Sequence, residues 1–260
     1  MTKEKDTLFL TLVVFVFIIL LIVSIPFVRK PKERIIPPKK ACLGRIAIVL
    51  DDWGYNLNNI PLLEKINLPL TVSVLPNLAY SKKISKDLTT QGFEIILHLP
   101  MEPEGKNAME KDTIKTSMQE EEIQGIILKS LDSVGNVKGV NNHMGSKATS
   151  SLKTMEVVFK ELKKRNLFFL DSYVISTSKC LDAAKRHGLR FAKRDIFIDN
   201  KNELEYIKKQ IQLLKSKAKK NGYAIGIGHD RKNTILALKE EMPKIEREGY
   251  KFVFISELVK

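Results

Sequence analysis

The sequence predicts an α/β protein: a closed or nearly closed β/α barrel of seven or eight parallel strands, preceded by one N-terminal transmembrane helix. From residue 44 onward, short β-branched runs alternate with longer amphipathic stretches. Near-continuous apolar strands separated by helices are typical of a parallel sheet that is covered on both faces. No Gly-rich phosphate loop follows the first strand, which argues against a dinucleotide-binding fold. An open doubly wound sheet remains the alternative architecture.

Residues 8–28 are predicted to form a transmembrane anchor that follows a short N-terminal tail, residues 1–7. The stretch 8–25 carries no charge, and its length is about the minimum for a helix that crosses ~30 Å of hydrocarbon. A cleavable signal peptide is the alternative. Its apolar region is usually only ~7–15 residues long and ends at small residues, whereas this one runs into Ser-Ile-Pro-Phe-Val. We therefore expect an uncleaved anchor.

Residues 29–43 are predicted to be a basic, proline-containing linker. Pro31, Pro37 and Pro38 interrupt any helix. Its charges either lie along anionic lipid headgroups or keep a plain spacer solvated. Because these charges outnumber those before the anchor, the positive-inside rule places the following domain in the cytoplasm.

The formal charge of +14 comes largely from lysine. A nucleic-acid partner is not expected, because the lysines are not interleaved with aromatic stacking residues and no binding motif is present. The two cysteines, Cys42 and Cys180, imply no disulfide framework.

Residues 44–260 are predicted to form the folded domain. Eight apolar runs are expected to be strands: 45–50, 71–75, 94–97, 137–140, 168–170, 189–192, 223–227 and 251–254. Six amphipathic stretches are expected to be the intervening helices: 81–91, 119–133, 151–165, 176–187, 203–219 and 233–248.

Acidic residues and histidines collect where these strands end. In a β/α barrel the loops after the strands form the active face. Three of the four histidines fall there, together with three aspartates: Asp51, Asp52, His98, His143, Asp171 and His229. The fourth, His187, ends a helix, where its charge suits the dipole.

One carboxylate and two imidazoles suit a borderline divalent metal, and a catalytic site leaves further positions open for water and substrate. Each residue alone is more often a helix cap or a structural side chain. Their convergence from distant parts of the chain is what indicates a metal site.

Six segments resemble, in order, the blocks of the divergent polysaccharide deacetylases, relatives of the NodB-like carbohydrate esterases: IAIVLDDWGYN, LPLTVSVLP, GFEIILHLPMEP, GVNNHMGSKATS, FFLDS and AIGIGHDRKNT. The resemblance covers nearly all of residues 44–260. It implies an irregular β/α barrel, a divalent metal with Zn²⁺ as the expected ion, and hydrolysis of an amide or ester on an acylated sugar. It also implies a bacterial inner-membrane protein whose domain is periplasmic or extracytoplasmic, which conflicts with the positive-inside count.

Carried over residue by residue, the resemblance makes Asp52, His98 and His143 the metal ligands. Asp51 would be the general base that takes a proton from metal-bound water, although adjacent strand-end residues can exchange roles. His229 would be the general acid.

The resemblance also makes Asp171 a residue that orients His229 or tunes its pKa. The sequence departs from the family at Tyr173 and Val174, where Arg and Thr are usual, and at Asp230, where Pro is usual. These changes bear on substrate choice and on whether catalysis is retained.

Three further residues are predicted to bind substrate. Trp53 would stack on a sugar ring or pack in the core. Asn142 would bond substrate or ligand side chains, or turn the chain. Glu102, another strand-end carboxylate, would contact substrate or shape the rim.

The expected function is a metal-dependent hydrolase that removes an acyl group, N-acetyl in the first place, from an envelope polysaccharide or oligosaccharide. The alternative is a non-catalytic envelope protein that keeps the metal site and binds glycan or a protein. A phosphoesterase ranks lower, because these ligands are few for the second metal that such enzymes often use. A serine hydrolase is a poor interpretation, since no G-x-S-x-G is present.

Overall fold

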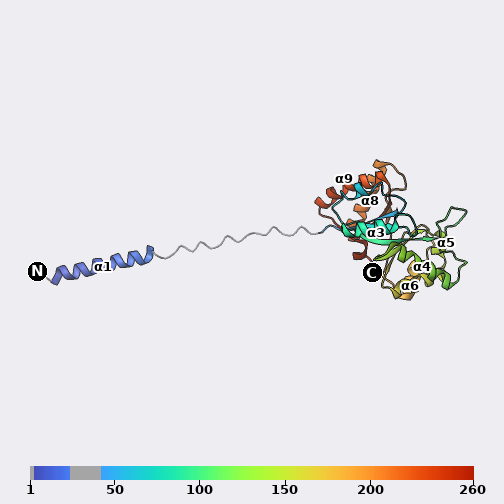
Figure 1. The fold of residues 1–260 in the computed structure, drawn as a ribbon. Helices are drawn as coiled ribbons and strands as arrows, with labels where there is room; N and C mark the ends of the chain where they lie inside the picture. The colour runs from blue at the N-terminus through green and yellow to red at the C-terminus, as the bar shows by residue number, and fades with distance from the viewer. Residues whose placement is uncertain (1–2, 24–41) are drawn as a thin grey trace. The chain divides into compact units, whose positions relative to one another are not determined.

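The computed structural model describes residues 3–23 and 42–260, and the chain divides into two units, Met1–Lys39 and Lys40–Lys260. In the first, helix α1 (Lys3–Val23) covers residues 8–23 of the predicted anchor (Figure 1). Residues 24–28 of that prediction, and the linker up to residue 41, lie outside the described residues. No helix in the described part of the chain is both long and apolar enough to cross a membrane.

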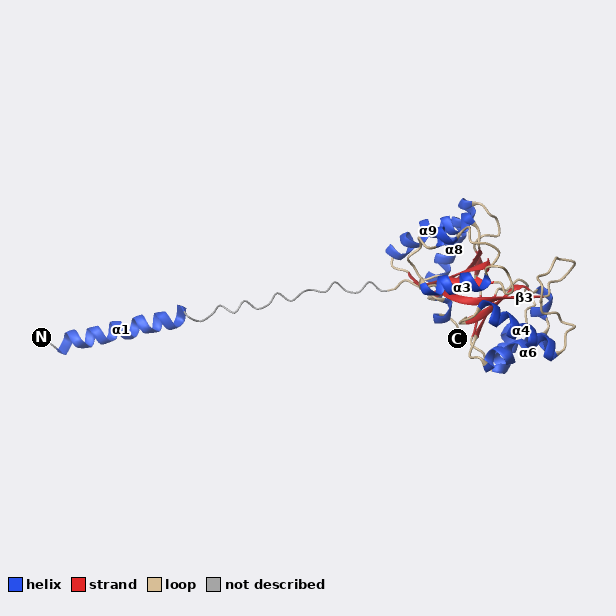
Figure 2. Cartoon of the chain, viewed as in Figure 1, coloured by secondary structure: helices blue, strands red, loops and turns tan. Residues whose placement is uncertain are grey.

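In the second unit, the described residues form one parallel sheet with helices on both sides (Figure 2). Its path runs β6-β5-β4-β3-β2-β1-β8-β7, and β9 pairs with the start of β1. The strands are β1 (Arg45–Trp53), β2 (Thr71–Val74), β3 (Glu94–Met101), β4 (Gly139–Met144), β5 (Phe168–Asp171), β6 (Phe191–Lys193), β7 (Ile196–Phe197), β8 (Tyr223–His229) and β9 (Lys251–Val253).

Every amphipathic stretch predicted to be a helix forms one. These helices are α3 (Ser81–Thr90), α4 (Glu120–Val134), α6 (Leu152–Lys164), α7 (Cys180–His187), α8 (Leu204–Asn221) and α9 (Lys232–Arg247). The structure adds the short α2 (Ile60–Leu63) and α5 (Ser146–Ser150), and a 3₁₀ turn, η1 (Ile255–Glu257).

The sheet is a curled half-barrel. β6 and β7 end the path on opposite sides, and Arg194 and Asp195 join them along the chain. Within residues 42–260 no strand pairing links β6 directly to β7. The predicted parallel β/α architecture is confirmed, with β7 as a strand that the sequence did not indicate.

Alternate residues of the strands pack on the two faces of the sheet. On β1, Ile46 and Ile48 contribute to the core between the sheet and the helices. Ala47 and Val49 face the barrel interior, where they share a cluster with Ile255 from η1. Burial of each large aliphatic side chain contributes roughly 1.5–3 kcal/mol to the free energy of unfolding. This two-sided burial fixes the strands, so the side chains at their ends hold defined positions.

Candidate metal centre and catalytic site

The end of β1 carries a bulge that brings two acids to one site. Leu50 lies opposite Val72 and Trp53 opposite Val74, so β1 has one extra residue there. Asp52 has a φ of 66°, in the left-handed region that few non-glycine residues adopt. Without the bulge, adjacent residues of a strand point to opposite faces. With it, both carboxylates lie beside His98: its Nε2 is 3.3 Å from Asp52 Oδ1 and 3.7 Å from Asp51 Oδ2.

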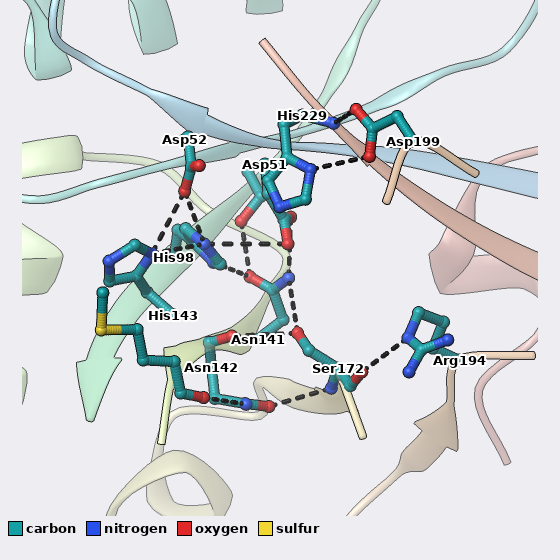
Figure 3. Close-up of polar contacts among 12 residues, drawn as sticks. Asp51, Asp52, His98, Asn141, Asn142, His143, Ser172, Arg194, Asp199 and His229 are labelled. Atoms are coloured by element: carbon teal, nitrogen blue, oxygen red, sulfur yellow. Dashed lines mark hydrogen bonds and ion pairs between the residues drawn. The ribbon is translucent and has the colours of Figure 1, made fainter. Parts of the chain in front are cut away.

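The three predicted metal ligands come together, from the ends of β1, β3 and β4 (Figure 3). His143 Nδ1 lies 3.1 Å from Asp52 Oδ1 and 3.2 Å from His98 Nε2, and the third side of the triangle is 3.3 Å. Ligand atoms ~2.0–2.1 Å from a tetrahedral Zn²⁺ lie roughly 3.3 Å apart. The donor set and its spacing therefore fit one face of a tetrahedral site, with further positions left for other ligands.

The buried side chain of Asn141 is hydrogen-bonded to both His98 and Asp51. Its Oδ1 accepts hydrogen bonds from His98 Nδ1 at 2.8 Å and from Ser73 Oγ at 2.5 Å, and its Nδ2 donates to Asp51 Oδ1 at 2.9 Å. Because Nδ1 of His98 carries the proton in this arrangement, the lone pair of Nε2 faces the centre. Asn141 lies next to Asn142 at the end of β4, where contacts with ligand side chains were expected.

Asp51 lies within the fold beside the ligand set. It is 2% exposed, and its partner across the β1–β8 ladder is His229. Burial raises the pKa of Asp51, although the neighbouring His98 and His229 oppose that shift. Asp52 is more exposed and contacts both imidazoles. Burial alone would raise its pKa, but the hydrogen bonds with His143 and His98 hold the pKa of Asp52 far below its ordinary value. The two acids thus differ in burial and in the direction of their pKa shifts.

The carboxylate that holds His229 is Asp199, which was not among the predicted site residues. Asp199 Oδ1 contacts His229 Nδ1 at 2.8 Å, and Oδ2 accepts from the backbone N–H of His229 at 2.8 Å and from Thr234 Oγ1 at 2.7 Å. Burial alone would lower the pKa of His229, but the Asp199 carboxylate raises it. Asp199 follows the two-residue strand β7, so the apolar run 196–198 before an aspartate was the available signal.

The prediction that Asp171 orients His229 is wrong. Its Oδ1 accepts from the backbone N–H of Tyr173 and its Oδ2 from Ser178 Oγ, both at 2.7 Å. Burial raises the pKa of Asp171. Because β5 and β8 lie far apart along the sheet path β5-β4-β3-β2-β1-β8, a strand-end position alone does not bring Asp171 into contact with His229. Asp171 fastens the loop that follows β5.

Trp53 and Asn142 are not placed to bind substrate, and each takes the structural role that was the alternative expected for it. Trp53 is 0% exposed and packs in the core between the sheet and the helices, so its ring is closed to a sugar. Asn142 is 1% exposed: its Nδ2 donates to the Met144 carbonyl and its Oδ1 accepts from the backbone N–H of Ser172. Asn142 therefore ties the end of β4 to the end of β5.

Glu102 shapes a loop, the second role considered for it. One carboxylate oxygen pairs with Lys147 Nζ at 2.7 Å, and the other accepts from the backbone N–H of Thr116 at 2.7 Å and from its hydroxyl at 2.8 Å. Both oxygens thus hold the long loop between β3 and α4 against α5. The predicted contact between Glu102 and substrate gives way to this structural role.

The sequence segments that carry these site residues follow one another along the chain in the order found in a known family. The sequence profile described as "Divergent polysaccharide deacetylase" matches residues 48–259. The chain belongs to this family. The chain is 35% identical over 197 residues to a curated relative, "Uncharacterized protein YibQ" of Escherichia coli K12. That alignment spans 76% of this chain and 62% of YibQ.

Solved structures share the fold of this chain. An uncharacterized protein of Agrobacterium tumefaciens C58, ATU2773, superposes with a TM-score of 0.80 at 24% identity, over 86% of this chain and 92% of its own. A family 4 carbohydrate esterase from Streptomyces lividans, solved in complex with acetate, superposes with a TM-score of 0.53 at 14% identity, over 83% of this chain and 94% of its own. These likenesses concern the fold.

Proposed function

We propose that this chain is a zinc-dependent hydrolase that removes an acyl group, N-acetyl in the first place, from an envelope glycan. The observation that carries the proposal is the presence of two proton-handling groups, Asp51 and the Asp199–His229 dyad, next to each other beside the Asp52–His98–His143 triangle (Figure 3). A site that only stored a metal would need neither. The acetate-bound esterase of the same fold supports an acyl substrate.

Each residue of the centre has its own task in this reaction. Asp52, His98 and His143 would hold the metal, which when bound supplies a Lewis acid and lowers the pKa of water. Asp51 accepts the proton of the attacking water, and its raised pKa brings its basicity nearer to neutral pH. Asp199 holds Nδ1 of His229, which leaves Nε2 to deliver a proton to the departing amine.

The decisive experiment is release of acetate. We expect the purified, zinc-loaded chain to release acetate from N-acetylated oligosaccharides, and Asp51→Asn to lower kcat at least roughly a hundredfold while zinc is retained. Asp171→Asn is the matched control, since it alters a buried strand-end aspartate outside the centre, and it should keep most of the activity. No acetate release from any acylated glycan, by a chain that retains zinc, would favour the non-catalytic alternative.

An extracytoplasmic location is part of the proposal, because an envelope glycan is met there. The basic count of residues 29–40 favours the opposite side. Protease added to intact spheroplasts would distinguish the two locations. Digestion of the folded unit supports an extracytoplasmic location, and protection until lysis contradicts it.

A further inference from the structure

An exposed tyrosine lies three residues after the metal ligand Asp52. Trp53 turns into the core at the bulge, and Tyr55, two residues further on, has 48% of its surface exposed. Its hydroxyl donates to Glu110 Oε1 in the loop between β3 and α4. The ring is thereby fixed in one orientation while much of its surface stays open. A fixed aromatic side chain binds at a low cost in conformational entropy.

The loop that supplies Glu110 is fastened on both sides of the centre. At its base, Glu102 N and Ile114 O, and Ile114 N and Pro100 O, are hydrogen-bonded at 2.9 Å. The backbone N–H of Glu104 donates to Ser146 Oγ at 2.7 Å, three residues after the ligand His143. Glu104 at one end of the segment 104–110 contacts Ser146, near His143, and Glu110 at the other end contacts Tyr55, near Asp52. The segment therefore runs from the His143 side of the centre to the Asp52 side. Residues 104–109 are all exposed.

We propose that Tyr55 and the segment 104–110 form a glycan subsite beside the centre, in which the Tyr55 ring stacks on the sugar next to the acylated one. This inference rests on the proposed function and names the part of the substrate that lies outside the reaction. The open faces of the ring and of the loop, rather than a closed pocket, suit an oligosaccharide that extends past the centre.

The rim around the ring carries charges of both signs. Glu110 lies at the ring, and Asp230 after β8 is oriented by Asn59 Nδ2 at 2.8 Å. The segment 104–110 also carries Lys106, and Lys147 near the loop is paired with Glu102. Because both signs are present, the subsite rests on the ring and the open loop, and a neutral N-acylated oligosaccharide is its probe.

Binding of N-acetylchitotetraose to the full zinc-loaded chain, measured by calorimetry in an Asp51→Asn background that blocks turnover, tests the subsite. We expect Tyr55→Ala to raise Kd roughly tenfold. Tyr55→Phe keeps the ring but loses the bond to Glu110, and Glu110→Gln weakens that bond. Both should raise Kd roughly two- to threefold. Leu213→Ala, on the exposed face of α8, is the control and should leave Kd unchanged.

An unchanged Kd in Tyr55→Ala, with the same Tm and zinc content as its parent, would overturn the subsite, and so would a parent chain that binds no tetraose. These results are separable from the proposed function: binding that depends on Tyr55 without acetate release removes the reaction and keeps the subsite. Acetate release with unaltered KM in Tyr55→Ala removes the subsite alone.

Discussion

Asp199 contacts His229 twice, through the imidazole Nδ1 and through the backbone N–H, each at 2.8 Å. The first contact orients the ring and favours its protonated form. The second fixes the end of β8 to the segment after β7. A single buried carboxylate therefore sets both the charge and the position of the proposed general acid.

Asp199→Asn should lower kcat/KM at least roughly tenfold and move the alkaline limb of its pH profile to lower pH. The Asp199 carboxylate raises the pKa of His229 above its ordinary value, so His229 stays protonated to higher pH in the native chain. Removing that charge lets the proton leave earlier. A profile of kcat/KM against pH measures this, and Asp171→Asn is the control whose alkaline limb should stay in place. Equal limbs in all three proteins would contradict the role of Asp199.

The same pair makes stability depend on pH. The pKa of Asp199 is lowered, because the bonds from His229 outweigh the effect of burial, so its contribution is lost as pH falls through its folded pKa. The pKa of His229 is raised, so its contribution is lost as pH rises through its folded pKa. In metal-free protein, the loss of unfolding free energy caused by His229→Gln should be greatest between about pH 4 and 6.5. Urea denaturation across this range checks it, and a loss that does not vary with pH would refute it.

Replacement of either imidazole should remove the metal. His98→Ala and His143→Ala each leave two of the three donor atoms, so we expect zinc retained after dialysis to fall from about one ion per chain to near none. His187→Ala, at the C-terminus of α7, should retain zinc like the parent. Metal analysis by mass spectrometry gives the answer, and full retention in both ligand variants would remove the assignment.

Asn141→Ala should weaken the site without touching a ligand. It frees Nδ1 of His98 and leaves Asp51 and Ser73 without a buried partner. Loss of such an outer contact typically lowers metal affinity roughly 10–100-fold, and the unpaired groups should cost about 1–3 kcal/mol of stability. Zinc titration and urea denaturation measure the two effects. An unchanged zinc affinity in this variant would show that Asn141 is not needed to orient the His98 ring.

Trp53 and Tyr55 should behave oppositely. Trp53→Ala removes a fully buried ring and is expected to cost about 3–5 kcal/mol of unfolding free energy. Trp53→Phe, which keeps most of the packing, should bind N-acetylchitotetraose as tightly as the parent. Thermal denaturation and calorimetry on the two variants give both values, and a weakened complex in Trp53→Phe with unchanged Tm would return the stacking role to Trp53.

The fold was predictable where burial and periodicity agree. The run 45–50 is apolar at nearly every position because β1 is buried on both faces, so its pattern is unambiguous. β7 has two residues, too few for a period to register, so its sign in the sequence was the short apolar run 196–198 alone. Asp199 was missed for the same reason, since its importance depends on following a strand.

The ligands were predictable for a different reason from their neighbours. Histidines are few in this chain, so the convergence of His98 and His143 with Asp52 at strand ends carries information. Trp53 and Asp171 also lie at strand ends, but their roles depend on a bulge and on which strands adjoin. Alternation along β1 places Trp53 only when the extra residue at Asp52 is counted. Such local departures from regular geometry are invisible to a pattern that assumes regularity.

Because of the bulge at Asp52, the geometry of this site depends on the number of residues between Leu50 and Trp53. A substitution at Asp51 or Asp52 changes one functional group and leaves the others where they are. Deletion of a single residue between Leu50 and Trp53 would restore regular pairing with β2 while Trp53 stays opposite Val74. Only one aspartate would then remain between these two core residues, so the site would lose either its proposed base or one proposed metal ligand. We therefore expect related chains to keep the number of residues between Leu50 and Trp53.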